Sequence, residues 1–173
     1  MKKKIFATGL AVLIGTAGLA VLKADANSSP TQVEVDRAAG TSMVLINSLV
    51  AGLVNLVLAT SNSGSSIAQG SQALSIIYDD RNENMRLVGQ SEPLSENSRP
   101  MDSFEVTALS RALAGQTYTS VERVMGSWYY RSSVPLANGV AQCAFCHTNF
   151  GPPDAADYKG ALMVRVLIPK NNT

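Results

Sequence analysis

A stretch of 23 residues without a charged side chain, from Ala38 to Thr60, restricts the fold of this chain more than any other feature. It lies in a proline-free segment, Val33–Thr60, where apolar residues recur every three or four positions, as on one face of a helix. Further apolar residues lie outside that stripe, and a helix that is apolar on most faces needs burial on most faces. We therefore expect a core helix. A seam between two copies of the chain is the second interpretation, and a membrane span of marginal length is the third.

The first 26 residues have the layout of a bacterial secretory signal. Three lysines follow Met1, no charge occurs from Ile5 to Leu22, and Ala24-Asp25-Ala26 fits the small-x-small cleavage pattern. We expect cleavage after Ala26, with a retained membrane anchor as the alternative, because 18 apolar residues are just enough to span a bilayer. Residues 27–173 are then one exported domain in the oxidising periplasm.

Charge and composition exclude several classes of function. Beyond residue 26 the chain carries 10 basic and 12 acidic residues, so it lacks the basic excess that a nucleic-acid-binding face needs. Its two cysteines and one histidine cannot complete a four-ligand zinc site.

The rest of the chain predicts short helices followed by strands, which indicates an α+β fold. We expect a short helix at Ile67–Tyr78, a strand at Met85–Gln90, and a helix from Phe104 to Ala114, capped by Ser103 and ended by Gly115. An antiparallel hairpin (Tyr118–Met125 and Ser127–Val134) and a closing strand (Gly160–Pro169) complete the prediction.

One motif carries chemistry: Cys143-Ala144-Phe145-Cys146-His147 is the C-x-x-C-H signature of c-type haem attachment. Thiols three positions apart can reach the two vinyl groups of one porphyrin, and the histidine that follows then lies beneath the iron. A redox dithiol would normally open a helix, and a local disulfide would leave His147 without a role. We expect one haem c, bound covalently through Cys143 and Cys146, with His147 as the proximal iron ligand.

The sixth iron position has fewer candidates. A second histidine and a third cysteine are both missing from the chain, which leaves methionine, water or an open site. Met85 and Met101 flank turns and are the candidate distal ligands, whereas Met43, Met125 and Met163 fit apolar patterns and are expected in the core. Arg86, Arg99 and Arg131 could pair with haem propionates, although exposure to solvent is the commoner role of an arginine.

Four segments in order resemble a known family: SSIAQGSQALSII, the loop ENSRPMDSFE, the strand WYYRSSVP ahead of CAFCH, and YKGALMVRVLIP. Across residues 33–169 the chain is similar to single-haem c-type proteins with a PAS-like fold, which occur alone or as extracytoplasmic sensing modules of bacterial receptors. Many relatives carry a distal cysteine ligand in the short second helix, where this chain has Gly70. The resemblance therefore implies a PAS-like antiparallel sheet and His147 as proximal ligand, but no thiolate opposite it.

These expectations lead to competing functions. The first is a periplasmic monohaem cytochrome that senses redox state or a diatomic gas, or transfers electrons. The second is a simple His/Met electron carrier, and a peroxidase-like enzyme is the weakest, because the chain offers no evident acid–base pair. The implied partners are a redox protein or a diatomic ligand, a membrane only if the leader is uncleaved, and a second copy through the Val33–Thr60 helix.

Overall fold

The computed structural model describes residues 28–62, 69, 72, 84–90, 98–145, 147, 151–153 and 156–169. In chain order its elements are α1 (Gln32–Asn62), β1 (Met85–Gly89), α3 (Ser103–Leu113), β2 (Tyr118–Val124), β3 (Ser127–Ala137), the 3-10 helix η2 (Ala141–Phe145) and β4 (Tyr158–Leu167). The leader and most of the predicted helix at Ile67–Tyr78 lie outside the described residues; Gln69 and Gln72 are helical.

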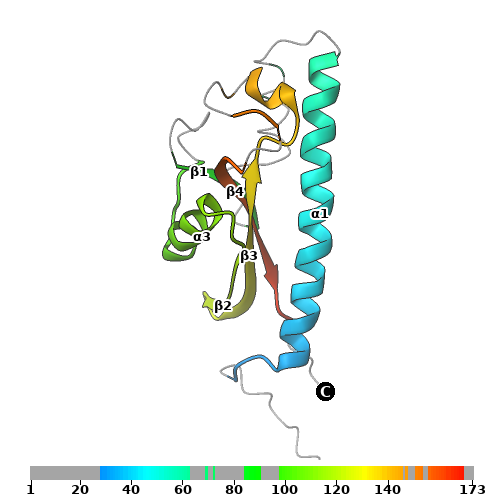
Figure 1. The fold of residues 1–173 in the computed structure, drawn as a ribbon. Coiled ribbons are helices and arrows are strands. Elements are labelled where there is room, and N and C mark those ends of the chain that lie inside the picture. Colours follow the sequence, from blue (N-terminus) through cyan, green and yellow to red (C-terminus); the bar gives the residue numbers. More distant parts are fainter. Residues whose placement is uncertain are drawn as a thin grey trace, which may run out of the picture.

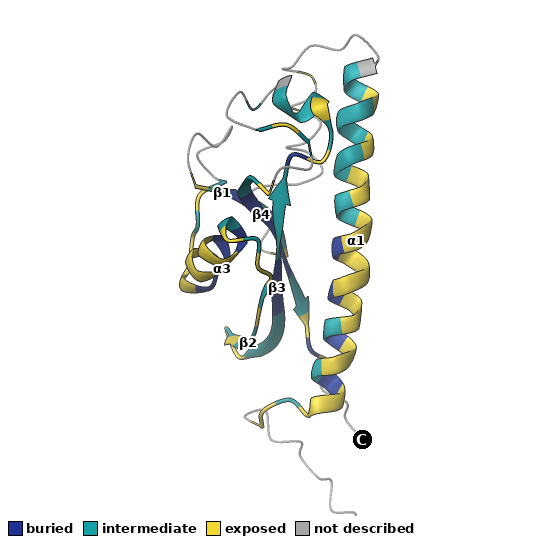
Figure 2. Ribbon diagram, in the orientation of Figure 1, coloured by how far each residue is buried: buried dark blue, intermediate teal, exposed yellow. Residues whose placement is uncertain are grey.

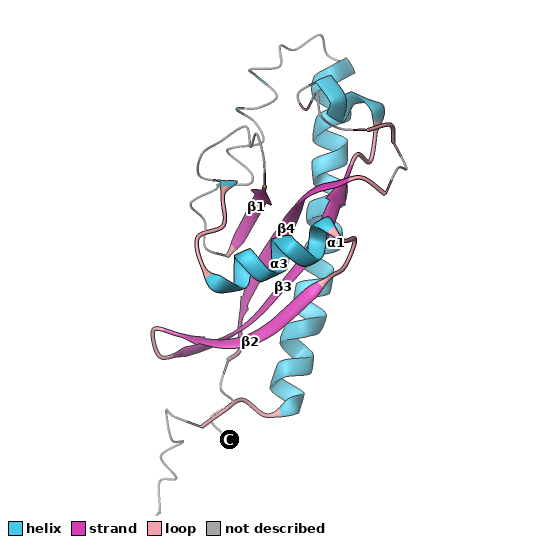
Figure 3. Cartoon of the chain, turned by 60° about the vertical axis from the view of Figure 1, so that its left-hand side comes forward, coloured by secondary structure: helices cyan, strands magenta, loops and turns pink. Residues whose placement is uncertain are grey.

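The four described strands form one antiparallel sheet in the order β1-β4-β3-β2. Helix α1 runs along one face of this sheet and α3 covers the other, as Figures 1 and 3 show. The structure confirms the predicted α+β class, the long first helix, the hairpin and the closing strand.

Both long helices begin with local side-chain caps. At the start of α1 the Glu34 carboxylate accepts from the Thr31 amide at 2.8 Å, while the Glu34 amide donates to the Thr31 hydroxyl at 3.4 Å, a reciprocal capping box. The cap of α3 is Asp102, whose carboxylate accepts from the Glu105 amide at 2.8 Å. The prediction of Ser103 as the cap was one residue late, because the acidic neighbour takes that role.

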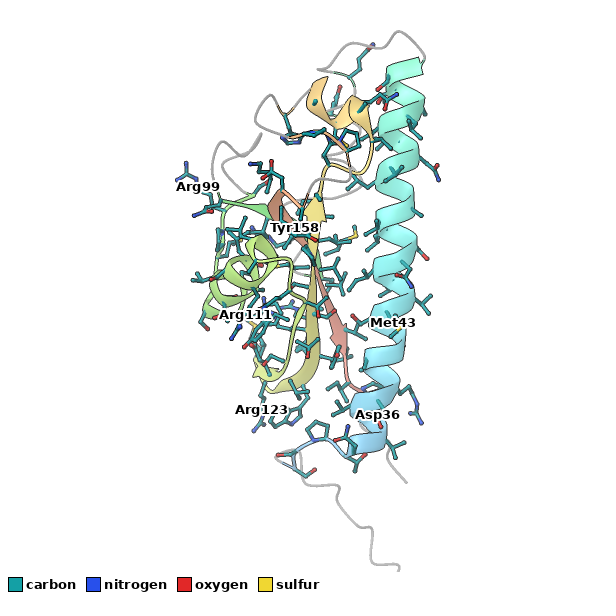
Figure 4. The ribbon with its side chains drawn as sticks, in the orientation of Figure 1. Asp36, Met43, Arg99, Arg111, Arg123 and Tyr158 are labelled. Carbon is teal, nitrogen blue, oxygen red and sulfur yellow. The ribbon has the colours of Figure 1, made fainter. Side chains whose placement is uncertain are left out.

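The core lies between α3 and the sheet. Phe104, Ala108, Leu109 and Ala112 of α3 pack on the sheet together with Val88, Ala161 and Met163. Figure 4 shows side chains filling this space, so α3 is the helix that the sheet buries.

Helix α1 contradicts the prediction of a core helix. Its buried residues form a stripe at four-residue spacing, made of Glu34, Ala38, Ser42 and Ile46. Only 6% of its most apolar window is buried, and the side chains of Val33, Met43 and Val44 are each 66% exposed. Figure 2 shows the exposed outer side of α1 in yellow. The reason is geometric: a sheet covers one side of a helix, and among the described residues nothing covers the other.

Two of three methionines expected in the core lie outside it. Met163 is buried in the α3 core, which confirms one expectation. Met125 is 99% exposed because it occupies the turn of the β2–β3 hairpin at φ 47°, and Met43 points away from the sheet on α1. Arg123 marks this hairpin end of the sheet in Figure 4.

Gly115 ends α3 in a position where a side chain would be doubly unfavourable. Its φ is +74°, and an added Cβ would lie 2.6 Å from Cε2 of Tyr158. Gly126 has a similar φ of +86° but open space around it.

We expect Gly126→Ala to lower the free energy of unfolding by about 1–2 kcal/mol, from backbone strain alone. Gly115→Ala should cost about 2–4 kcal/mol, since the Tyr158 ring must also move. Urea denaturation of both variants measures the difference; equal losses would contradict this packing.

Candidate cofactor-binding site

The motif begins just beyond the end of β3, in the 3-10 helix η2. The Cys143 amide donates to the Val140 carbonyl at 3.0 Å, and the His147 amide donates to the Cys143 carbonyl at 3.1 Å. The second bond joins the backbones of Cys143 and His147, so the two residues lie within one turn of the chain. Cys146 lies outside the described residues.

Cys143 and His147 are both half-buried, and their chemistry fits ligation. Cys143 forms no disulfide with another described residue. Burial lowers the pKa of the His147 imidazole below its ordinary value, which favours the neutral ring that metals bind. In the described part of the chain, no group of three His, Cys, Asp or Glu side chains could hold a bare metal ion.

A groove lies beside this turn, between the C-terminal half of α1 and β3. Its volume is about 500 Å³, inside the 300–1,000 Å³ range of ligand-binding pockets. Its walls are apolar apart from two amides: Ile46, Asn47, Val50, Ala51, Val54 and Asn55 of α1, and Val134 of β3. An added Cβ on Gly139, just ahead of η2, would lie 3.7 Å from Val54, and α1 also contacts η2. In Figure 1, η2 lies beside the C-terminal end of α1.

The structure thus brings together two features that are far apart in sequence. The C-x-x-C-H motif was predicted from the sequence, but the groove beside α1 was not. A signal existed: Asn47 and Asn55 interrupt the apolar run eight residues apart, and both line the groove.

Asn138 closes the loop that carries the motif. Its side-chain amide donates to the Gly151 carbonyl at 2.7 Å, and the Gly151 amide donates to the Asp157 carboxylate at 3.1 Å. Asp157 in turn lies 2.7 Å from the Lys159 ammonium on β4. These bonds tie the segment from Asn138 to Gly151, motif included, to the ends of β3 and β4.

Removing the side-chain amide donor of Asn138 should loosen the loop that carries the motif. Asn138→Asp keeps the size of a buried side chain but cannot donate to Gly151. We expect a loss of about 1–3 kcal/mol in the free energy of unfolding, the cost of an unpaired buried group. Urea denaturation measures it, and Asn47→Asp, an exposed change of the same kind, is the control. Equal stability of the Asn138 variant and wild type would show that the hydrogen bond from Asn138 to Gly151 contributes nothing to the free energy of unfolding.

The two candidate distal methionines lie on opposite sides of the sheet. On β1, Arg86 and Val88 face α3, so Met85 points to the α1 face, which it shares with the groove. Strand β4 lies between β1, the strand of Met85, and β3, which lines the groove. Met101 is 71% exposed just before α3, and its amide donates to the Glu105 carboxylate at 2.8 Å. The placement favours Met85 over Met101, although a ligand role for either stays a prediction.

Two of the three arginines are neither exposed nor beside the groove. Arg86 lies 3.2 Å from Glu105, and Arg131 lies 2.6 Å from Asp102 and 3.0 Å from Glu122, all on the α3 face. Arg131 also lies over the Phe104 ring, with its guanidinium carbon 4.1 Å from the centroid. Solvent exposure was therefore wrong for Arg86 and Arg131, because acidic residues around the start of α3 bury them. Arg99 is exposed, as expected.

Burial and hydrogen bonding have opposite effects on the pKa values of Asp102 and Glu105. Burial raises the pKa of Asp102, but hydrogen bonds from Arg131 and the Glu105 amide outweigh it, and the pKa falls below its ordinary value. For Glu105 burial prevails over the Met101 amide and Arg86, and the pKa is raised. This cluster is structural, since it stabilises the contact between α3 and the sheet.

Comparison with known proteins adds no family. No protein-family model matches the chain, and a search of curated proteins finds no match.

Proposed function

We propose that this chain is an exported c-type cytochrome with one covalently attached haem, which senses redox state or a diatomic gas, or transfers electrons. The observation that carries the proposal is the backbone turn that holds Cys143 and His147 close together, next to an apolar groove of ligand size. The motif supplies two covalent anchors and an axial ligand, and the groove supplies an apolar wall.

The residues present fit the cofactor. The Cys143 and Cys146 thiols would add across the two vinyl groups, each forming a sulfur–carbon bond while the proton goes to the neighbouring vinyl carbon. His147 would bind the iron, and its lowered pKa keeps the ring available for that role. The bound haem supplies a one-electron iron couple and a position for a diatomic ligand.

The fold supports the PAS-like resemblance in its general form. An antiparallel sheet with α3 on one face and a long N-terminal helix on the other matches what that resemblance implies. Among the groove residues, Asn47 and Asn55 offer amide donors, and donors near the iron help decide whether a small ligand binds. These amides favour the sensing role over simple electron transfer.

The second candidate is a His/Met electron carrier. Its support is the position of Met85, on the same face of the sheet as the groove. Methionine ligation would raise the reduction potential and close the sixth position to gases.

The absorption spectrum of the ferrous protein with and without carbon monoxide tests these roles. A sensor with an open or exchangeable site should bind carbon monoxide rapidly, with a shift of the main haem band. An unchanged spectrum would reject that role and support the carrier. In a carrier ligated by Met85, Met85→Leu should restore the shift, while the exposed Met101→Leu serves as the control. A protein without haem absorption would contradict both.

A further inference from the structure

The first half of α1, residues 32–46, is attached firmly to the rest of the fold. All the buried residues of the helix lie in this half or at its end: Glu34, Ala38, Ser42 and Ile46. The helix start is fixed by the hydrogen bonds between Thr31 and Glu34, and the Ser42 hydroxyl is hydrogen-bonded to the Ser132 hydroxyl of β3. These contacts hold the first half on the sheet.

The second half of α1, residues 47–62, has a different environment. None of residues 47–61 is buried, although this part of the chain carries no charge. In Figure 2 the dark blue bands of α1 lie in its lower, N-terminal half. The groove lies between the second half and β3, and most of its lining comes from that half: Asn47, Val50, Ala51, Val54 and Asn55. Side chains that face a groove make fewer contacts than those in a packed core, so the sheet stabilises this half less.

Intrinsic helix propensity does not distinguish the two halves. Each contains one glycine, Gly40 or Gly52, and several β-branched residues. A helix of about 15 residues is only marginally stable in water without tertiary contacts. The stability of each half therefore follows its contacts with the rest of the protein. We expect the second half to open at a lower free energy than the first.

The end of α1 adds little that would compensate. The Thr60 hydroxyl donates to the Leu56 carbonyl at 2.9 Å, and the Ser61 hydroxyl donates to the Val57 carbonyl at 2.7 Å. Such bonds back to the preceding turn are local and slightly destabilise a helix. The last turn also carries no basic side chain that would interact favourably with the helix dipole.

An occupant of the groove would supply contacts to the second half. The motif lies at this end of the helix, because η2 contacts α1 and a Cβ on Gly139 would lie 3.7 Å from Val54. If haem is attached there, its apolar surface can pack on the groove wall. This step rests on the proposed function, whereas the difference between the two halves does not.

We propose that α1 consists of two parts: residues 32–46 stay on the sheet, while residues 47–62 open independently and are held closed when haem fills the groove. Attachment of the cofactor then changes the order of a helix segment that also contacts solvent. The segment is thus an element through which the protein can report the state of its groove to a partner.

Hydrogen–deuterium exchange of the mature full-length chain tests the difference between the halves. In the haem-free variant Cys143→Ala/Cys146→Ala, we expect the amides of residues 50–58 to exchange at least about tenfold faster than those of residues 36–46. Fraying of the helix end would accelerate only the last turn, which this comparison leaves out. Equal protection of the two segments overturns the proposal. So does loss of protection across β3 and β4 as well, because the protein would then open as one unit.

A larger side chain in the groove tests the closing step without any cofactor. Val134→Phe, made in the haem-free variant, extends from β3 into the groove. It should slow the exchange of residues 50–58 by about threefold or more and leave residues 36–46 unchanged. The control is Val121→Phe on β2, 37% exposed and outside the groove. Ala51→Leu fills the groove from the helix side and replaces Val134→Phe if circular dichroism shows that the latter is misfolded. No slowing in a folded groove variant overturns the proposal.

Wild type completes the comparison. With haem attached, it should show the same slowing of residues 50–58 relative to the haem-free variant. Attached haem without slowing contradicts the coupling of α1 to the groove. A wild-type mass without haem contradicts the proposed function instead, and the two haem-free experiments then decide on the two-part helix.

Discussion

Replacement of both Cys143 and Cys146 with alanine is expected to abolish covalent haem attachment. The thiols are the only groups of the motif that can form thioether bonds, and the chain has no further cysteine to replace them. Cys143 is half-buried in a short helix rather than in the core, so the change should leave the sheet and α3 intact. After denaturation and removal of free cofactor, the double variant should show no haem absorption, whereas wild type keeps all of it.

Single variants sharpen this experiment. Each should retain haem through one thioether, with a shifted absorption band, since one vinyl group stays unreacted. Met101→Leu, an exposed change outside the motif, should leave the attachment unaffected. Haem that stays bound to the denatured double variant would contradict the assignment of the two cysteines.

Loss of Glu105 should be the largest single effect on stability. Its carboxylate is 3.2 Å from Arg86 and 3.8 Å from Arg131, and it accepts the Met101 amide. Glu105→Leu would leave the buried Arg86 guanidinium without this partner, and we expect a loss of about 3–5 kcal/mol in the free energy of unfolding. Urea denaturation measures it. Arg111→Gln, an exposed change on the same helix, should stay within about 0.5 kcal/mol of wild type.

A double variant separates charge from packing. Arg86→Met combined with Glu105→Leu replaces the buried ion pair with apolar side chains of similar length. Because the uncompensated charge is then gone, we expect the pair to be more stable than Glu105→Leu alone. Additive losses would mean that Glu105 acts through packing and its hydrogen bond, not through Arg86.

Local sequence patterns predicted most of the described fold. The β-branched and aromatic residues on either side of Gly126 form β2 and β3, the apolar run near the end of the chain forms β4, and the helical periodicity of the first segment forms α1. Each of these patterns is local in the sequence. Each element therefore lies within a few residues of its expected position. The environment of α1 could not be predicted in this way. A pattern shows that a helix is apolar, but which side meets the sheet depends on tertiary packing.

Only the local part of the candidate site could likewise be predicted from the sequence. The spacing of Cys143, Cys146 and His147 could be read directly, because the chemistry lies within five consecutive residues. The groove required the C-terminal half of α1 to approach Val134, about 80 residues further along the chain. Arg86 and Arg131 were misjudged for a similar reason, since their acidic partners come from separate elements.

The mass of the intact mature protein tests the central claim most directly. Produced by export in a host with functional cytochrome maturation, the purified and denatured chain should exceed its polypeptide mass by one haem. Peptide mapping should locate that excess between Val140 and Gly151, the segment that contains both cysteines. A mass equal to that of the amino acids alone, under the same conditions, would contradict the account.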